Sequence, residues 1–182
     1  EGTVTDTDGN IIEGAKVEVW HANSLGNYSF FDKSQSDFNL RRSILTDTDG
    51  HYVAQTTMPV GYGCPPDGTT QAVLNKLGRH GNRPSHVHYF VSAPGYRKLT
   101  TQFNIEGDKY LWDDFAFATR DGLVATAVDV TDEAEIARRG LNHPFKHITF
   151  NIELRGELAE IWRRDEIVYM RWAIAMTAQL IQ

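Results

Sequence analysis

Short stretches of alternating apolar and polar residues recur through the first two-thirds of the chain. Residues 15–20 alternate with a period of two, and residues 51–56 follow an Asp-Gly turn in the same way. This period is typical of strands that bury one face. Further short strands are predicted at residues 3–5, 87–91 and 148–152. The pattern therefore predicts a protein that is mainly β.

Two turns of the same sequence, Thr-Asp-Thr-Asp-Gly, occur at residues 5–9 and 46–50. Glycine takes a positive φ at no steric cost and aspartate tolerates it, so each turn favours a hairpin. Several short strands divided by Gly, Pro and Asp turns favour a sandwich of two sheets. We therefore expect a two-sheet β-sandwich with long loops and a C-terminal α-helix.

The long loops are predicted where the alternation stops. Residues 23–42 are polar and aromatic without a clear period, and residues 59–70 hold three prolines and three glycines. Such stretches indicate irregular backbone, and loops on a rigid β scaffold often carry the functional site. Short helices are predicted at residues 71–77 and 131–140, the second with a start at Thr131 or Asp132 and a stop at Gly140.

The end of the chain has a different composition. Residues 157–181 contain neither Gly nor Pro and favour one long helix. We expect a β-sandwich domain in residues 1–154 and a helix in residues 155–182. The helix would place much of an apolar stripe on one side, which predicts packing on the sandwich or on a second chain in a homodimer. An interfacial membrane helix is the alternative. The stripe comprises Leu158, Ile161, Trp162, Val168, Trp172, Met176 and Leu180.

Composition and charge narrow the class of protein. The 182 residues fit one domain, and residues 167–181 are shorter than the ~20 apolar residues that span a bilayer. Lysine and arginine total 18 against 24 acidic residues, so the net charge of −6 argues against a nucleic-acid partner. A single cysteine, Cys64, and the lack of a visible signal peptide favour a reducing, cytoplasmic location.

The candidate chemistry lies in two histidines and two tyrosines. His86 and His88 are two apart on a predicted strand, so both side chains point to one face and can reach one metal ion. Tyr28 lies in an aromatic loop, and Tyr62 lies between two glycines that let the backbone come close to a site. The simpler alternatives are a half-exposed strand with ordinary histidines and a loop tyrosine packed on proline.

A metal bound by these four side chains would be trivalent. Two phenolates and two neutral imidazoles would bring a charge of −2, which favours ferric over ferrous iron. Phenol has an ordinary pKa near ~10, so a hard cation is needed to make it a ligand at neutral pH.

Six stretches carry a resemblance to a known family. They read AKVEVWHAN at residues 15–23, DFNLRRSI at 37–44, GYGCPP at 61–66, LGRHGNRPSHVHYF at 77–90, SAPGYRKLTTQ at 92–102 and LWDDFAFATRDGL at 111–123. Together they resemble the intradiol ring-cleavage dioxygenases, over residues 2–152 approximately. The fold of that family is a β-sandwich, which agrees with the strand pattern.

The resemblance implies a role for each site residue. Tyr28 would be the iron ligand that stays bound and Tyr62 the ligand that leaves when substrate arrives. His86 and His88 would be the retained imidazoles. In addition, the resemblance implies that Arg83 lies over the substrate ring, that Gln102 is its hydrogen-bonding neighbour, and that Phe115 and Ala116 touch the ring.

The activity implied is cleavage of catechol, a small aromatic diol, by O₂ to cis,cis-muconate at a non-haem Fe(III) site. Residues 1–154 would then form the catalytic β-sandwich. The same fold acting on hydroxyquinol or a chlorocatechol is an alternative, and Cys64 in GYGCPP resembles the catechol enzymes more. An inactive iron-binding fragment, or a β-sandwich binding module, is another, because the chain lacks the helical region that precedes the sandwich in the family.

Overall fold

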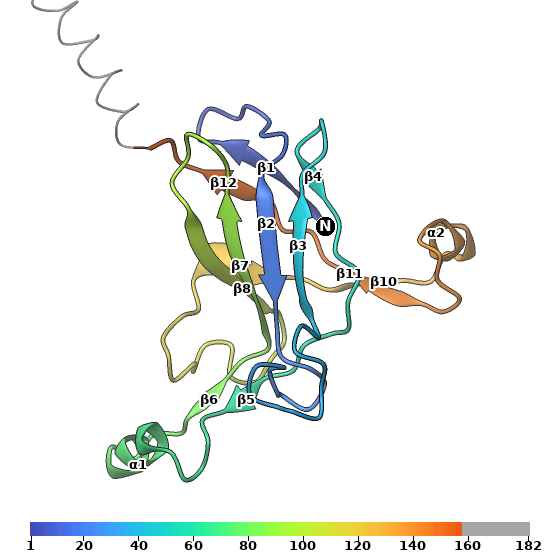
Figure 1. Cartoon of the computed structure of the whole chain (residues 1–182). Helices are drawn as coiled ribbons and strands as arrows, with labels where there is room; N and C mark the ends of the chain where they lie inside the picture. The colour runs from blue at the N-terminus through green and yellow to red at the C-terminus, as the bar shows by residue number, and fades with distance from the viewer. Residues whose placement is uncertain (158–182) are drawn as a thin grey trace, which may run out of the picture.

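The computed structural model describes residues 1–157, and strands make up most of its regular structure (Figure 1). The larger sheet has the strand order β3-β2-β7-β8-β9. Neighbouring strands are antiparallel except β8 and β9, which run parallel. The bounds are Arg41–Leu45 for β3, Lys16–Trp20 for β2, His86–Ser92 for β7, Leu99–Ile105 for β8 and Val124–Ala125 for β9.

The smaller sheet has the order β12-β1-β4, with β1 parallel to β12 and antiparallel to β4. Two-stranded ribbons complete the strands, β5 with β6 and β10 with β11. The bounds are Gly2–Asp6 for β1, His51–Tyr52 for β4, Tyr62–Gly63 for β5, Asn82–Arg83 for β6, Val128–Val130 for β10, Phe145–His147 for β11 and Ile152–Leu154 for β12.

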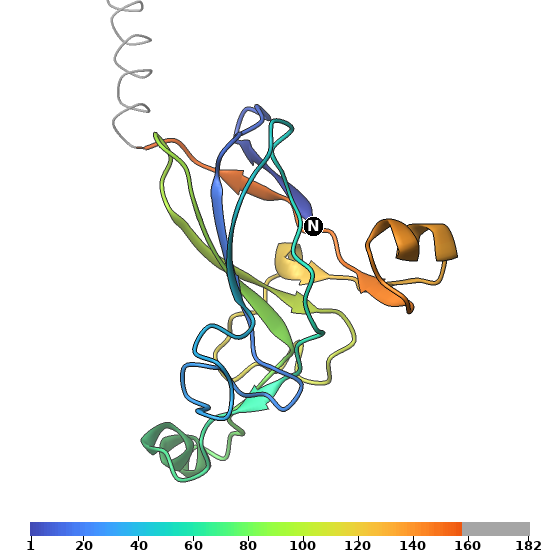
Figure 2. The same cartoon turned by 45° about the vertical axis from the view of Figure 1, so that its right-hand side comes forward.

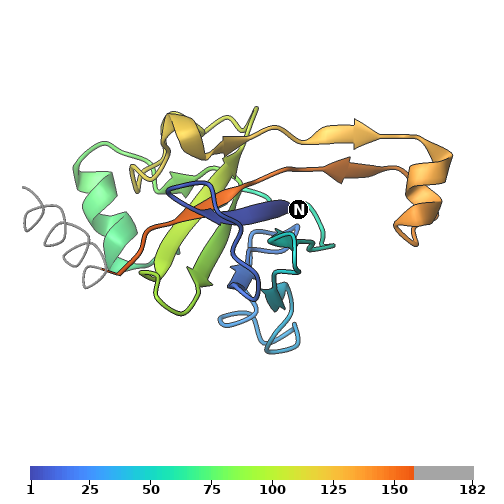
Figure 3. The same ribbon diagram turned by 90° about the horizontal axis from the view of Figure 1, so that it is seen from above.

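Two short helices and one 3₁₀ turn lie in the connections. Helix α1 spans Thr69–Lys76, helix α2 spans Glu133–Arg138, and the 3₁₀ turn η1 spans Asp121–Leu123. Helix α1 caps the β5–β6 ribbon at one end of the molecule (Figure 2). Helix α2 lies at the tip of the β10–β11 ribbon, which projects away from the two main sheets (Figure 3).

The core lies between the two main sheets. Val17 and Val91 of the larger sheet and Val4 of the smaller sheet are fully buried, and Leu154 is 1% exposed. These side chains belong to one apolar cluster. Burying a side chain of this size stabilises the fold by roughly 1.5–3 kcal/mol. The prediction of a mainly β, two-sheet sandwich is therefore confirmed.

The alternation located some strands correctly and misplaced others. Strands β1, β2 and β7 cover the predicted residues 3–5, 15–20 and 87–91 almost completely. The strand predicted at residues 51–56 is wrong beyond Tyr52, and the one predicted at residues 148–152 starts only at Ile152. Alternation is a local signal, whereas a strand also requires a neighbour with which to form backbone hydrogen bonds.

Both Thr-Asp-Thr-Asp-Gly turns form, with a φ of +83° at Gly9 and +68° at Gly50. The first turn reverses the chain, and an antiparallel bridge joins Thr5 to Ile11 across it. The prediction of a hairpin is wrong for the second, because it joins β3 of the larger sheet to β4 of the smaller one. The turn sequence specifies a reversal of the chain, but the partner of each strand is chosen by tertiary packing.

Both predicted short helices are present. Helix α2 begins after Asp132, whose side chain accepts a hydrogen bond from the backbone N–H of Glu135, and the chain turns at Gly140 with a φ of +69°. The helix predicted at residues 157–181 lies outside the described residues except for Glu157. The helical segment predicted at residues 155–182 is described only at residues 155–157, which are not helical. Within residues 1–157, no helix is long and apolar enough to cross a membrane.

Candidate metal centre

The two histidines of the candidate centre are presented by strand β7. Val87, Tyr89 and Val91 point into the core, so His86 and His88 project from the opposite face of the larger sheet. Strand β7 is paired on both sides, with β2 and with β8, which fixes the position of both imidazoles. The prediction that both histidines lie on one face is confirmed.

The two tyrosines reach the same place from loops. Tyr62 opens the β5–β6 ribbon, where it is paired with Arg83. Tyr28 follows a tight turn in which the side chain of Asn23 accepts hydrogen bonds from two backbone N–H groups. Gly26 in this turn has a φ of +81°, and a Cβ atom there would lie 3.0 Å from Cβ of Tyr62. The two loops therefore pack closely, and glycine permits the approach.

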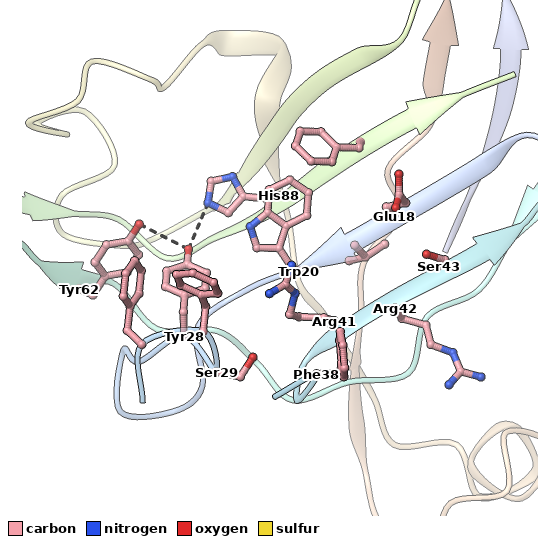
Figure 4. A pocket seen from close by; sticks show the side chains of 14 residues that line it. Glu18, Trp20, Tyr28, Ser29, Phe38, Arg41, Arg42, Ser43, Tyr62 and His88 are labelled. Atoms are coloured by element: carbon pink, nitrogen blue, oxygen red, sulfur yellow. Dashed lines mark hydrogen bonds between the residues drawn. The ribbon is translucent and has the colours of Figure 1, made fainter. Parts of the chain in front are cut away.

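The polar atoms of these four side chains converge, and Figure 4 shows three of the residues, Tyr28, Tyr62 and His88. The Tyr28 hydroxyl lies 3.4 Å from the Tyr62 hydroxyl, 3.4 Å from Nε2 of His86 and 3.1 Å from Nε2 of His88. The two Nε2 atoms are 3.1 Å apart. Atoms that share an ion at about 2 Å lie roughly 3 Å from one another, so this spacing matches a coordination shell.

The hydrogen bonds of His86 place its proton on the outer nitrogen and a lone pair on the inner nitrogen. Its Nδ1 lies 2.7 Å from the carbonyl oxygen of Pro84, so Nδ1 carries the proton and donates it. Nε2 then has a lone pair, which accepts a hydrogen bond from Arg83 at 3.1 Å. Donation from the far nitrogen to a backbone carbonyl is the usual arrangement of a metal-binding histidine.

The protonation of the four groups suits a cation. Burial, followed by the positive charge of Arg83, lowers the pKa of His86 to about 4. Burial and then the neighbouring His86 lower the pKa of His88 to about 3. Both imidazoles are thus neutral at pH 7, as metal ligands must be. Burial raises the pKa of Tyr28, so its phenolate form requires a nearby cation.

Within residues 1–157, no group of three or more His, Cys, Asp or Glu side chains is placed to hold a metal ion. The two tyrosines are therefore essential to the candidate centre. The two phenolates provide hard, anionic oxygen ligands, and the two neutral imidazoles provide nitrogen ligands. This donor set fits a ferric ion better than a softer divalent metal.

A cavity of about 590 Å³ opens beside the centre and is lined by Tyr28, Tyr62 and His88. Trp20 also lines it, and its ring stacks on His88 with centroids 4.8 Å apart and planes 8° apart. Further aromatic and cationic side chains line the cavity. The most exposed of these are Phe30, Phe31 and Phe38, together with Arg41 and Arg42.

Arg83 and Gln102 are brought together as predicted. Nη2 of Arg83 donates to Oε1 of Gln102 at 3.0 Å, and Arg83 is 9% exposed. Burial lowers the pKa of Arg83, but the carboxylate of Asp114 outweighs it, and the pKa is raised overall. Arg83 is therefore a permanent cation that touches the metal centre through His86.

Phe115 and Ala116 lie in the loop after Asp114, and they are not among the residues that line the cavity. Phe115 is half-buried and Ala116 is exposed. Their backbone is tied to the site, because Phe115 N–H donates to the carbonyl of Asn82 and Ala116 N–H donates to Asp114. Their predicted contact with the substrate ring stays a prediction.

Trp20 and Asp114 belong to the site, although the sequence pattern gave neither of them a role. Trp20 faces His88 because strands β2 and β7 pair in that register, and the partner of a strand cannot be read from its own alternation. Asp114 stands beside Phe115 in the motif that carried the resemblance. It is only 3% exposed, whereas an aspartate in a loop is normally exposed to solvent.

Comparison with known proteins identifies the family. The model of the dioxygenase family matches residues 1–165. Catechol 1,2-dioxygenase of Acinetobacter guillouiae is 82% identical over 154 residues, covering 85% of this chain and 50% of that protein. The chain spans about half the length of the curated relatives it matches.

Solved structures give the same result. The crystal structure of wild-type Acinetobacter radioresistens catechol 1,2-dioxygenase is 90% identical with a TM-score of 0.84, covering 86% of this chain and 50% of that one. Hydroxyquinol 1,2-dioxygenase of Pseudomonas putida is 35% identical with a TM-score of 0.78, covering 86% and 55%. The chain therefore belongs to the dioxygenase family.

Proposed function

We propose that this chain cleaves catechol with O₂ between the two hydroxyl-bearing carbons, giving cis,cis-muconate at a non-haem Fe(III) site. The convergence of two tyrosine hydroxyls and two imidazole nitrogens at 3.1–3.4 Å carries the proposal. Relatives that are 82% and 90% identical bear the name catechol 1,2-dioxygenase, which supports the choice of substrate.

Tyr28, Tyr62, His86 and His88 would hold the iron. When bound, ferric iron would withdraw electron density from a chelated catechol and thereby make the ring reactive toward O₂. Tyr62 is half-buried and lines the cavity, where its phenolate, once released from the iron, would accept a proton from an incoming catechol. Tyr28 lies between both imidazoles and Tyr62, which suits a ligand that remains in place.

Arg83 and Gln102 would stabilise the negative charge that develops on the substrate ring. A buried cation whose contacts are fixed in advance does not need to reorganise during the reaction. Gln102 holds one end of the Arg83 guanidinium, and its own amide N–H donates to Asn104 at 2.8 Å. Phe115 and Ala116 would complete the apolar contact with the ring.

Two alternatives remain as outcomes of the test. Hydroxyquinol or chlorocatechol as substrate has less support, since the hydroxyquinol enzyme is only 35% identical to this chain. An inactive iron-binding fragment is the second alternative, because the chain spans only half of its relatives.

The full chain should be produced with ample ferric iron and tested with catechol and isotopically labelled O₂. We expect one iron per chain, a red colour from phenolate-to-iron charge transfer, and both labelled oxygen atoms in the muconate product. Hydroxyquinol and a chlorocatechol supplied in parallel decide the substrate. A colourless protein that contains zinc would contradict the proposal, and iron and colour without turnover would support the inactive fragment.

We also propose that the chain forms a homodimer and resides in the cytoplasm. The predicted apolar stripe of residues 157–181 supports the dimer, and the single cysteine supports a reducing compartment. Sedimentation of the full chain and of a chain ending at Leu154 tests the first part. Two monomers of equal thermal stability would contradict it.

A further inference from the structure

A buried carboxylate lies behind the proposed catalytic cation. Asp114 is 3% exposed, and its side chain accepts hydrogen bonds from two nitrogens of Arg83, Nε at 3.2 Å and Nη2 at 3.1 Å. The two parallel contacts use both carboxylate oxygens. Such a bidentate pair fixes the plane of a guanidinium as well as its distance.

The remaining nitrogen of Arg83 points toward the proposed metal ligands. Nη1 donates to Nε2 of His86 at 3.1 Å, while Nη2 is shared between Asp114 and Gln102. Asp114 therefore holds the side of the guanidinium that faces away from His86. Burial raises the pKa of Asp114, but the hydrogen bonds from Arg83 and the backbone outweigh it and leave the pKa below its ordinary value. The group is an anion and only accepts.

The same carboxylate folds the loop that carries Phe115 and Ala116. It accepts hydrogen bonds from the backbone N–H of Ala116 at 3.0 Å and of Ala118 at 3.2 Å. Phe117, between them, has a φ of +52°, a conformation that residues other than glycine rarely adopt. A backbone of this kind persists where surrounding contacts hold it.

A second route joins this loop to the sheet. The side chain of Gln102 donates to Asn104, which is fully buried and donates to the hydroxyl of Thr119 at 2.7 Å. Thr119 belongs to the loop that Asp114 begins. The contacts thus form a closed ring that runs from Asp114 through Arg83, Gln102, Asn104 and Thr119 and returns along the backbone.

We propose that Asp114 is a positioning residue that locks the Arg83 guanidinium and the 115–118 turn into one rigid unit. The inference rests on the proposed function, in which Arg83 stabilises charge on the substrate ring and Phe115 and Ala116 touch that ring. Among the described contacts, the Asp114 side chain bonds to Arg83 and to the backbone of the turn, and to none of the four proposed metal ligands. Its effect on the rate passes chiefly through Arg83, and its effect on the 115–118 turn is measured by the hydrogen exchange of the turn's amides.

The test compares Asp114→Asn with Asp113→Asn. Asn at position 114 must turn an amide group toward the donors of Arg83 or toward the loop amides, so one set of contacts is lost. Asp113 is the adjacent residue with the same chemistry, but its side chain is 68% exposed and bonds only to His80 among the described contacts. It is a matched control for charge and position.

We expect Asp114→Asn to bind iron and develop the same colour as the parent protein. A misplaced group near the reacting atoms typically slows a reaction by about 100-fold. We therefore expect kcat to fall by about 100-fold while KM changes only a few-fold, and Asp113→Asn to change neither. Asp114→Glu, which restores the charge, should recover part of the lost kcat.

An Arg83→Met background separates positioning from general support of the fold. If Asp114 acts through Arg83, adding Asp114→Asn to Arg83→Met causes little further loss of kcat. An equal loss in both backgrounds would overturn the proposal, and so would loss of iron binding in Asp114→Asn alone.

A measurement without metal keeps the inference independent of turnover. In the parent protein and in Asp113→Asn, the Arg83 guanidinium should be ordered and its Nε–H proton should exchange slowly with solvent. In Asp114→Asn the guanidinium should be mobile and the exchange fast, and Asp114→Glu should restore both in part. Hydrogen exchange of the Ala116 and Ala118 amides should accelerate in parallel. Equal order of Arg83 in the parent and Asp114→Asn would overturn the proposal. A parent protein without colour or turnover would contradict the proposed function instead.

Discussion

The histidines of the candidate metal centre come from a strand, whereas the tyrosines come from loops. His86 and His88 lie on β7, which is hydrogen-bonded to β2 and β8 along its length. Tyr28 and Tyr62 depend on local turns, and Tyr62 is paired only with Arg83 in a two-residue ribbon.

The difference assigns separate tasks to the two regions. A doubly paired strand cannot move one imidazole without disturbing the sheet, so it suits ligands that remain bound. A short ribbon and a loop can adjust at lower free energy, which suits a ligand that must leave. The sheet would therefore hold the iron, and one loop would take part in the exchange with substrate.

The largest contrast should appear between His86→Ala and Tyr62→Phe. We expect His86→Ala to reduce iron affinity by at least about 100-fold, because a ligand from the rigid strand has no substitute. Tyr62→Phe should stay within roughly tenfold of the parent in iron affinity, yet lose about 100-fold or more in turnover as its proton acceptor is gone. Iron content after dialysis and steady-state rates measure both. Equal loss of iron in the two variants would remove the distinction between strand and loop.

A smaller effect is expected where the two tyrosine loops touch. Gly26→Ala would place a Cβ atom 3.0 Å from Cβ of Tyr62, in addition to the strain at a φ of +81°. Gly9→Ala has nearly the same φ of +83° with nothing within 4 Å, so it carries the strain alone. That strain costs about 1–2 kcal/mol.

Both glycine variants should therefore lower thermal stability, and Gly26→Ala should lower it more, because the contact with Tyr62 adds to the backbone strain. Only Gly26→Ala should shift the charge-transfer band of the iron-loaded protein, because Tyr62 moves. Absorption spectra and thermal melts of the two variants provide the comparison. The same band in both would show that the loops adjust without affecting the phenolate.

Trp20 tests how the sheet orients one of its histidines. Its ring stacks on His88, and a close aromatic pair contributes roughly 0.5–1.5 kcal/mol beyond buried area. Trp20→Leu should weaken iron binding by about two- to tenfold, and Trp20→Phe should recover part of it. Trp112→Leu, at a tryptophan that is 68% exposed, should have no effect on iron affinity. Competition with a chelator measures the iron affinity of each variant. An unchanged affinity in Trp20→Leu would show that the strand alone orients His88.

The smallest effect concerns pH and the Tyr28 loop. Hydrogen bonds from Ser34, and then from Gln35 and Asn27, lower the pKa of the half-buried Asp32 from 3.8 to about 2. The folded loop therefore binds fewer protons than the unfolded loop, and the contribution of Asp32 is complete above pH 3.8 and lost as the pH falls toward 2.

Hydrogen exchange of the loop amides should accelerate over this pH range relative to that of β7, after correction for the intrinsic rates. Asp32→Asn should remove the pH dependence. A loop whose protection follows that of β7 at every pH would contradict the assignment.

Some features of the fold followed from the sequence because they are local. The period-two pattern of residues 15–20 and 87–91 located β2 and β7, and Asp132 with Gly140 marked the ends of the region around α2. Strand β8 was not predicted, although its faces are divided: Leu99, Phe103 and Ile105 pack in the core, whereas Thr100, Gln102 and Asn104 lie on the other face. Strand β3 was assigned in part to a loop, since its residues are mostly exposed and polar.

The sequence by itself determined that His86 and His88 share a face, because side chains two apart on a strand must do so. It also determined which tyrosines could join them, through motifs that resemble a known family. Only the tertiary structure decided that the Tyr28 hydroxyl comes within 3.4 Å of the polar atoms of the other three ligands, that Trp20 lies against His88, and that Asp114 is buried behind Arg83. These facts depend on strand register and on the packing of separate loops, which are set by contacts between residues far apart in the chain.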